Sequence, residues 1–135
     1  MAARSKARKR AVDVLYEADV RGSDRLALLR DRIDTGNPPV PEHTVRLVEG
    51  VAEHASRIDA LIDAHASNWS IDRLPDVDRA ILRMAVYELL WVDDVPDAVV
   101  IDEAVELAKT LSTDDSPAYV NGVLGAILAA EVPTA

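Results

Sequence analysis

The stretch Val77-Asp-Arg-Ala-Ile-Leu-Arg-Met-Ala-Val-Tyr-Glu-Leu89 does more than any other part of the chain to decide the fold class. Val77, Ile81, Met84 or Ala85, and Leu89 recur at the spacing of one helical face, and further apolar residues lie between them. A helix that is apolar on most of its surface belongs in the middle of a fold. The stretch therefore predicts a central helix in an all-α protein.

Patterns of the same kind predict helices on both sides of this stretch. Gly22 ends the first helix, Ser23 caps the second, and Pro41, Pro96 and Ser116-Pro117 begin later ones. The expected helices cover residues 5–20, 23–33, 41–66, 77–89, 96–108 and 116–128. We therefore expect a single-domain helical bundle of about six to seven helices over residues 1–135, with residues 1–4 flexible. The loop at 34–41 is internal, because about 33 residues before it could not bury a core alone.

Composition excludes several classes of protein. The chain has no cysteine, which rules out disulfides, thiolate metal sites and a cysteine nucleophile. No segment approaches the roughly 18 to 20 apolar residues that cross a bilayer, and no apolar segment follows the N-terminal charges as in a secretory signal. We therefore expect a cytoplasmic protein that does not interact with membranes.

Charge is distributed very unevenly. The first ten residues hold five basic and no acidic side chains, whereas the remaining residues hold ten basic and 24 acidic ones, a balance of +5 against −14. The basic residues are Arg4, Lys6, Arg8, Lys9 and Arg10. Such a cluster is either a local contact for nucleic-acid phosphates or a solvated terminus without a role. The pattern Ala7, Ala11, Val14, Leu15 and Ala18 continues through it, which favours a fixed helix that holds Arg4, Arg8 and Lys9 largely off its apolar face.

Signatures of catalysis and metal binding are missing. His43, His54 and His65 are eleven residues apart, which separates neighbours on a helix by about 16 Å. Glu103 and Glu106 lack the histidine that a carboxylate-bridged metal site needs three residues after a glutamate. Phosphate-loop and dinucleotide-binding glycine patterns are also absent from the sequence. We expect a protein that is not an enzyme and carries no metal or cofactor.

Several motifs resemble the NusB family of transcription antitermination factors. They follow one another along essentially the whole chain: residues 4–16, Trp69, 78–89, Val95-Pro96, 100–109 and 119–124. The runs Tyr-Glu-Leu, Glu-Ala-Val-Glu-Leu-Ala-Lys and Val-Asn-Gly-Val-Leu carry most of the likeness. Three positions depart from the family pattern, since Asp13 replaces glutamine, Asp102 replaces asparagine and Tyr119 replaces phenylalanine. These departures bear on individual RNA contacts.

The resemblance implies a non-catalytic, all-helical protein that binds single-stranded boxA leader RNA. It would do so together with the ribosomal protein NusE, within the RNA polymerase antitermination complex. Single strands are bound by cations along the backbone and by planar groups against the bases. The RNA-binding residues implied are Arg4, Lys6, Arg8, Lys9, Arg10, Tyr16, Arg83, Asp115, Tyr119 and Asn121.

Some of these roles have structural alternatives. Tyr16 and Tyr87 could equally pack in the core. Asn121-Gly122 lowers helix propensity, which indicates either a tight helix crossing at Gly122 or a contact made by Asn121. Replacing Arg8 and Lys9 by alanine is expected to weaken RNA binding and to leave the fold intact.

A basic partner such as NusE would be attracted to the acidic body of the protein. The candidate surface comprises Asp72, Asp76, Asp78, Arg79 and Leu82. The alternative is that the carboxylates only cap the helix that begins near Val77. The alternative hypothesis is that the whole chain is a protein-only adaptor or a homodimer. Measurements of boxA binding and of the mass in solution distinguish it from the RNA-binding hypothesis.

Overall fold

The computed structural model describes residues 2–66 and 70–131, and these form helices and connecting loops without a β-strand. Trp69, which contributes to the family resemblance, lies outside the described residues. The elements are α1 (Ala2–Arg21), α2 (Arg25–Thr35), α3 (Glu42–Glu53), α4 (Ala55–His65), the short 3-10 helix η1 (Ile71–Arg73), α5 (Asp76–Trp91), α6 (Asp97–Leu111) and α7 (Ser116–Glu131). The all-α prediction is confirmed.

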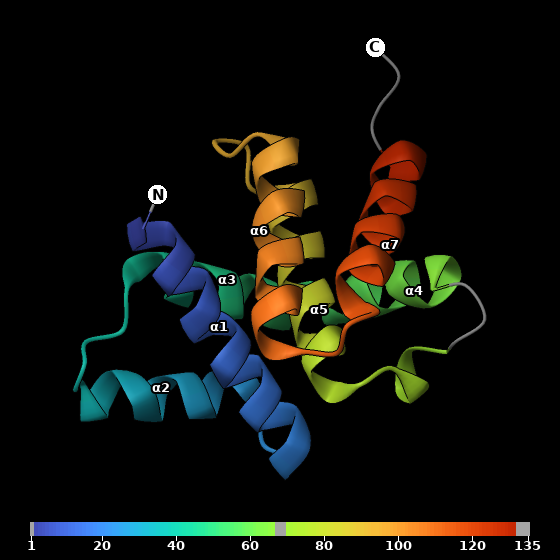
Figure 1. Ribbon diagram of the computed structural model, residues 1–135. Coiled ribbons are helices and arrows are strands. Elements are labelled where there is room, and N and C mark those ends of the chain that lie inside the picture. The colour runs from blue at the N-terminus through green and yellow to red at the C-terminus, as the bar shows by residue number, and fades with distance from the viewer. Residues whose placement is uncertain (1, 67–69, 132–135) are drawn as a thin grey trace.

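Helix α5 is the centre of the molecule, as the sequence predicts (Figure 1). Helices α1, α2 and α3 pack on one another, α7 packs on both α4 and α6, and α5 contacts α1, α3, α4, α6 and α7. Every residue from Asp78 to Val86 is buried. Because α5 is covered on nearly all sides, its sequence has to be apolar around most of its circumference.

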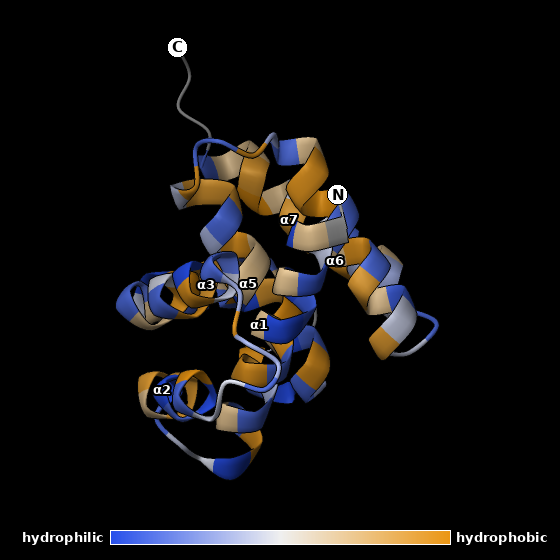
Figure 2. Ribbon diagram, turned by 90° about the vertical axis from the view of Figure 1, so that its left-hand side faces the viewer, coloured by the Kyte–Doolittle hydropathy of each residue, from blue (hydrophilic) through white to orange (hydrophobic). Residues whose placement is uncertain are grey.

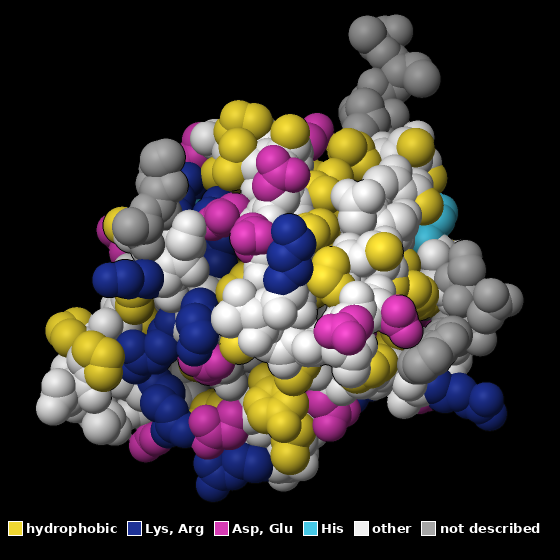
Figure 3. Space-filling view, viewed as in Figure 1, with side chains coloured by type: hydrophobic (Ala, Val, Ile, Leu, Met, Phe, Trp, Pro, Cys, Tyr) yellow, Lys and Arg dark blue, Asp and Glu magenta, His cyan; other side chains and the backbone are white. Residues whose placement is uncertain are grey.

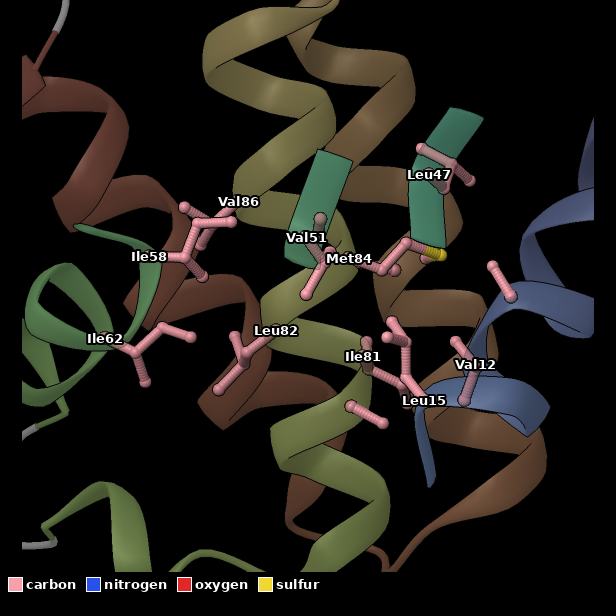
Figure 4. Close-up of a cluster of buried hydrophobic side chains, with 14 of the residues drawn as sticks. Val12, Leu15, Leu47, Val51, Ile58, Ile62, Ile81, Leu82, Met84 and Val86 are labelled. Carbon is pink, nitrogen blue, oxygen red and sulfur yellow. The ribbon is translucent and has the colours of Figure 1, made fainter. Parts of the chain in front are cut away.

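The core consists of aliphatic side chains that these helices turn toward α5. Polar and apolar residues alternate along the helices in the way that one buried face requires (Figure 2). Close to α5, the core includes Val12 and Leu15 of α1, Leu47 and Val51 of α3, Ile58 and Ile62 of α4, and Ile81, Leu82, Met84 and Val86 of α5 (Figure 4). Leu82 is fully buried, so the expectation that it lies on a partner-binding surface is wrong.

The long helix expected over residues 41–66 is divided at His54. This residue leaves helical geometry, with φ −109° and ψ 21°, and separates α3 from α4. Both halves pack on α5, but their other neighbours differ: α3 packs on α1 and α2, and α4 on α7 and η1. Hydrogen bonds from His54 N to Gly50 O and from Ile58 N to His54 O, at 3.0 and 2.9 Å, carry the backbone through the bend.

Helix ends follow the sequence signals with small shifts. Gly22 ends the first helix with φ +65°, a conformation that glycine adopts without strain. The cap of α2 is Asp24 and not Ser23, since Asp24 Oδ2 accepts a hydrogen bond from Ala27 N at 2.9 Å. Pro41 and Pro96 each directly precede a helix, and Ser116 begins α7. The first helix already begins at Ala2, so Arg4 is helical.

Gly50 of α3 lies directly against the ring of Tyr87 of α5. A Cβ at this position would overlap the ring of Tyr87, whereas a Cβ at Gly122 would meet nothing within 4 Å. The tight crossing that one interpretation placed at Gly122 is therefore wrong. The close contact occurs at Gly50, where no sequence pattern indicated it.

Replacing Gly50 by alanine should lower the free energy of unfolding by about 1–3 kcal/mol, because the added methyl group forces Tyr87 out of its packed position. Gly122→Ala is the matched control. It adds the same atoms to an open helical site and should be neutral or stabilising by up to about 1 kcal/mol. Urea unfolding of both variants checks this, and equal effects would contradict the close approach at Gly50.

Candidate nucleic-acid interface

The exposed side of α1 carries a line of cations. Lys6, Lys9, Asp13 and Tyr16 are exposed and three or four residues apart, which places them along one edge of the helix. Arg10 is half-buried beside them and donates a hydrogen bond to Pro38 O at 3.3 Å. In the space-filling view, Lys and Arg side chains follow the course of α1 between α2 and α6 (Figure 3). We call Lys6, Lys9 and Arg10 the cationic edge.

The cations of this edge have few competing anions. Lys9 Nζ lies 3.4 Å from Asp13 Oδ2, a contact between two exposed groups that contributes little. Lys6 forms no ion pair within 4.0 Å in the part of the chain that the structure describes. Arg4, one turn before Arg8, is partly exposed and pairs with Asp94 at 3.2 Å. Phosphate oxygens could therefore approach Lys6 and Lys9 without displacing a strong intramolecular partner.

Arg8 does not belong to this exposed edge. Its side chain is buried, with only 3% of the residue exposed, and its Nε and Nη2 donate to the two carboxylate oxygens of Glu88 at 2.8 and 2.7 Å. Its Nη1 donates to Glu103 Oε1 at 2.9 Å. The expectation that Arg8 lies off the apolar face is wrong, because position 8 precedes Ala11 and Leu15 by three and seven residues and so shares their buried face.

The group formed by Arg8, Glu88, Glu103, His43 and Ser5 connects four helices, and we call it the arginine clamp. Ser5 donates to Glu103 at 2.5 Å, and His43 Nε2 lies 3.1 Å from Glu88 Oε2. Thr44 adds a hydrogen bond to the α1 backbone at Ala7 O, at 2.7 Å. These contacts fix the first half of α1 against α3, α5 and α6. They thereby fix the direction in which the cationic edge faces.

The clamp also shifts the pKa values of its members. Burial opposes the charge on Arg8, but the hydrogen bonds and negative charges of Glu88 and Glu103 outweigh it and raise the pKa of the guanidinium. Burial lowers the pKa of His43, and the positive charges of Arg4 and Arg8 lower it further, against the opposing effect of Glu88. His43 is therefore neutral near pH 7 and donates its Nε2 proton to the Glu88 carboxylate.

Arg83, one of the residues expected at the RNA, is buried elsewhere on α5. Its guanidinium donates to the two Asp59 oxygens at 2.9 and 3.1 Å and lies 3.5 Å from Asp19. Asp19 is about 14 Å along α1 from Arg10, so the structure does not bring Arg83 to the cationic edge. Arg79 also pairs with Asp19, at 2.8 Å, and donates to the carbonyls of Ile71 and Leu74.

Asp115 and Tyr119 lie together at a small pocket of about 360 Å³ at the start of α7. Tyr119 is half-buried, and burial together with the charge of Asp78 raises the pKa of its phenol. Asp115 is exposed beside it. Asn121 is exposed on α7, and the contact that one interpretation assigned to its side chain stays a prediction. This group is separate from the arginine clamp.

The acidic surface near η1 is smaller than the sequence indicates. Asp72 and Asp76 are exposed, but Asp78 is 3% exposed and accepts hydrogen bonds from Ser112 Oγ and Ser116 Oγ at 2.5 and 2.9 Å. Asp78 thus joins α5 to the α6–α7 turn and does not cap its own helix, which begins after Pro75 without a hydrogen bond from a capping side chain. With Arg79 and Leu82 also buried, Asp72 and Asp76 are what remains of the predicted surface.

The described residues contain no group of three or more His, Cys, Asp or Glu side chains that could hold a metal ion. Within the same residues, no helix is both long and apolar enough to cross a membrane. The helices packed around α5 and the cationic edge of α1 are features of an all-helical nucleic-acid-binding protein.

The comparisons narrow this class to one family. A model of the NusB family matches residues 5–129, and the chain belongs to that family. Transcription antitermination protein NusB of Saccharopolyspora erythraea is 64% identical over 129 residues, which cover 94% of this chain and 87% of that protein.

Solved structures of NusB proteins are similar to this chain over nearly its whole length. Thermotoga maritima NusB superimposes with a TM-score of 0.85 at 36% identity, covering 96% of this chain and 93% of the other. A NusB chain from the crystal structure of antitermination factors NusB and NusE in complex with dsRNA gives a TM-score of 0.84 at 34% identity, covering 96% and 98% of the two chains.

Sequence reasoning missed Glu88, Glu103 and His43 as partners of the basic helix. Glu88 lies 80 residues from Arg8, so no local pattern connects the two. One signal was present in the sequence. An arginine at a position of the apolar face needs a buried carboxylate partner, because an unpaired buried charge is strongly destabilising.

Replacing Arg8 by alanine should lower the free energy of unfolding by roughly 3–5 kcal/mol, because Glu88 keeps a buried charge without its main partner. Lys9→Ala, the exposed neighbour, should change it by no more than about 0.5 kcal/mol. The double variant Arg8→Met, Glu88→Leu should recover most of the loss, since it removes both charges. Urea unfolding measures all three, and equal stabilities of the Arg8 and Lys9 variants would refute the clamp.

The neutral His43 should make stability depend on pH. The folded-state pKa lies below the ordinary value of 6.5, so the unfolded chain takes up a proton first as pH falls. His43 therefore makes its full contribution to the free energy of unfolding above about pH 6.5, and this contribution is lost as pH falls toward the folded-state pKa. The stability difference between wild type and His43→Gln should shrink between about pH 7.5 and about pH 5.5. A difference that is the same at every pH would show that His43 does not titrate on unfolding.

Proposed function

We propose that this chain is a non-catalytic, cytoplasmic transcription antitermination factor that binds boxA leader RNA together with NusE within the RNA polymerase antitermination complex. The observation that carries the proposal is the cationic edge of α1, held in place by the arginine clamp. The protein has a net charge of −9, so it repels polyanions as a whole and needs a local cationic surface to bind RNA. Membership of the NusB family supports this reading.

The arrangement along α1 suits a single strand. Lys6, Lys9 and Arg10 would contact backbone phosphates, with Arg4 at the end of the line. Tyr16 is 39% exposed, on the same edge about 15 Å beyond Lys6, where its ring can accept a stacked base. Asp13 lies between them and would keep phosphates away from that part of the helix. Arg8 acts indirectly, because its guanidinium is already bound to two carboxylates.

A second set of contacts would involve the start of α7. Asp115, Tyr119 and Asn121 are accessible at least in part, and Tyr119 and Asn121 belong to a family motif. NusE would bind near Asp72 and Asp76, whose exposed carboxylates attract a basic ribosomal protein. The similar NusB–NusE complex contains double-stranded RNA, so single-stranded boxA and a duplex of the same sequence both belong in the test.

Salt dependence of boxA binding tests the proposal. Each phosphate contact on a single strand releases counterions and contributes roughly −0.7 to the slope of log binding constant against log salt concentration. Three contacts therefore predict a slope of about −2. The variant Lys6→Ala, Lys9→Ala should weaken binding at low salt and flatten the slope to about −0.7, because one of the three contacts remains. Fluorescence anisotropy with labelled boxA RNA gives both quantities.

The control is Arg57→Ala, which removes an exposed arginine of α4, a helix outside the group that packs with α1. It should leave affinity and slope unchanged. Thermal unfolding checks that each variant is folded, and the mass in solution shows whether a second copy of the chain competes with RNA. Equal slopes for wild type and the double lysine variant would refute RNA binding by the cationic edge.

A further inference from the structure

A groove of about 740 Å³ lies between α3 and the second half of α5, near the beginning of α1. Its lining includes Glu42, Glu49 and Glu53 of α3 and Tyr87 of α5. Tyr87 is ten residues, or about 15 Å, along α5 from Val77, at the opposite end of the helix from Asp76 and the surface proposed for NusE. Apart from Arg4, which is directed to Asp94, and His43 of the arginine clamp, the residues that line the groove have no role in the proposed function.

The aromatic side of the groove is built to a fixed shape. Tyr87 lies against Gly50, where no side chain would fit, so its ring is held close to α3. Trp91 continues the row one turn later, with its ring centroid 5.9 Å from that of Tyr87 and the two planes 14° apart. His54 stacks on Trp91 at 4.2 Å. Of these three nearly parallel rings, that of Tyr87 lines the groove, and Trp91 and His54 support it from behind through the stack.

The α3 side of the groove carries three acidic side chains. Glu42, Glu49 and Glu53 are exposed and spaced seven and four residues apart, which places them along one edge of α3. Glu42 and Glu49 form no ion pair within 4.0 Å with any described residue, and Glu53 has only a 3.9 Å contact with His54. Two arginines also line the groove, but both Arg4 and Arg46 are directed to Asp94.

Carboxylates opposite an aromatic ring form the arrangement that recognises a guanidinium group. The planar cation of arginine donates paired hydrogen bonds to a carboxylate and stacks on an aromatic face, whereas the lysine ammonium is a strongly hydrated point charge. Phosphate is disfavoured here because the three glutamates repel it. We propose that this groove binds an arginine-containing segment of a basic protein partner, independently of the RNA on α1.

The probe is a short glycine-rich peptide with two arginines, compared with the same peptide in which lysine replaces both. NMR titration of the full chain should shift the ring signals of Tyr87 and Trp91 in a saturable way, and the lysine peptide should bind several-fold more weakly. The variant Glu49→Gln, Glu53→Gln should lower the affinity for the arginine peptide about tenfold.

The matched control is Asp102→Asn, Glu106→Gln, which removes the same amount of charge from exposed positions of α6. It should change the affinity less than twofold, and boxA RNA should not displace the peptide. Equal losses in the two double variants would show only general attraction to an acidic protein and would overturn the proposal. Saturable shifts confined to residues outside the groove would also overturn it, and so would displacement of the peptide by RNA.

Discussion

The ion pair between Arg8 and Glu88 is the interaction on which the arrangement of the surface depends. Both side chains are almost completely buried, and Glu103 and His43 complete the set of partners. Two charges in a protein interior repay their desolvation only when geometry and hydrogen bonds are complete. The clamp therefore favours one placement of α1 over nearby alternatives more than it adds net stability. The direction of the cationic edge follows from that placement.

The basic residues of this protein have two different uses. Arg8, Arg79 and Arg83 are directed inward and pair with carboxylates from other helices, where the planar guanidinium can satisfy several acceptors at once. Lys6 and Lys9 are directed outward, where a flexible hydrated ammonium remains available to a phosphate. A count of N-terminal charges therefore overstates the number of RNA contacts, because Arg8 belongs to the interior.

Most of the helices could be predicted because their signals are local. Periodic apolar residues, Gly22, the prolines before α3 and α6 and the serine at the start of α7 act within a few residues of the positions they determine. The division at His54 could not be predicted, since the apolar pattern from Val48 to Ile62 runs through it unchanged. The interruption lies where α3, packed on α1 and α2, gives way to α4, packed on α7.

The sequence by itself determined the helical class, the central position of α5, the family and the existence of a basic helix, because periodicity, composition and motifs are properties of the chain. The tertiary structure decided which charges are available. Arg8, Asp78 and Leu82 all looked accessible along their own helices, yet each is buried by elements distant in sequence, such as Glu88 against Arg8 and Ser112 against Asp78. Burial is a property of the packed helices together, and therefore no local pattern could assign it.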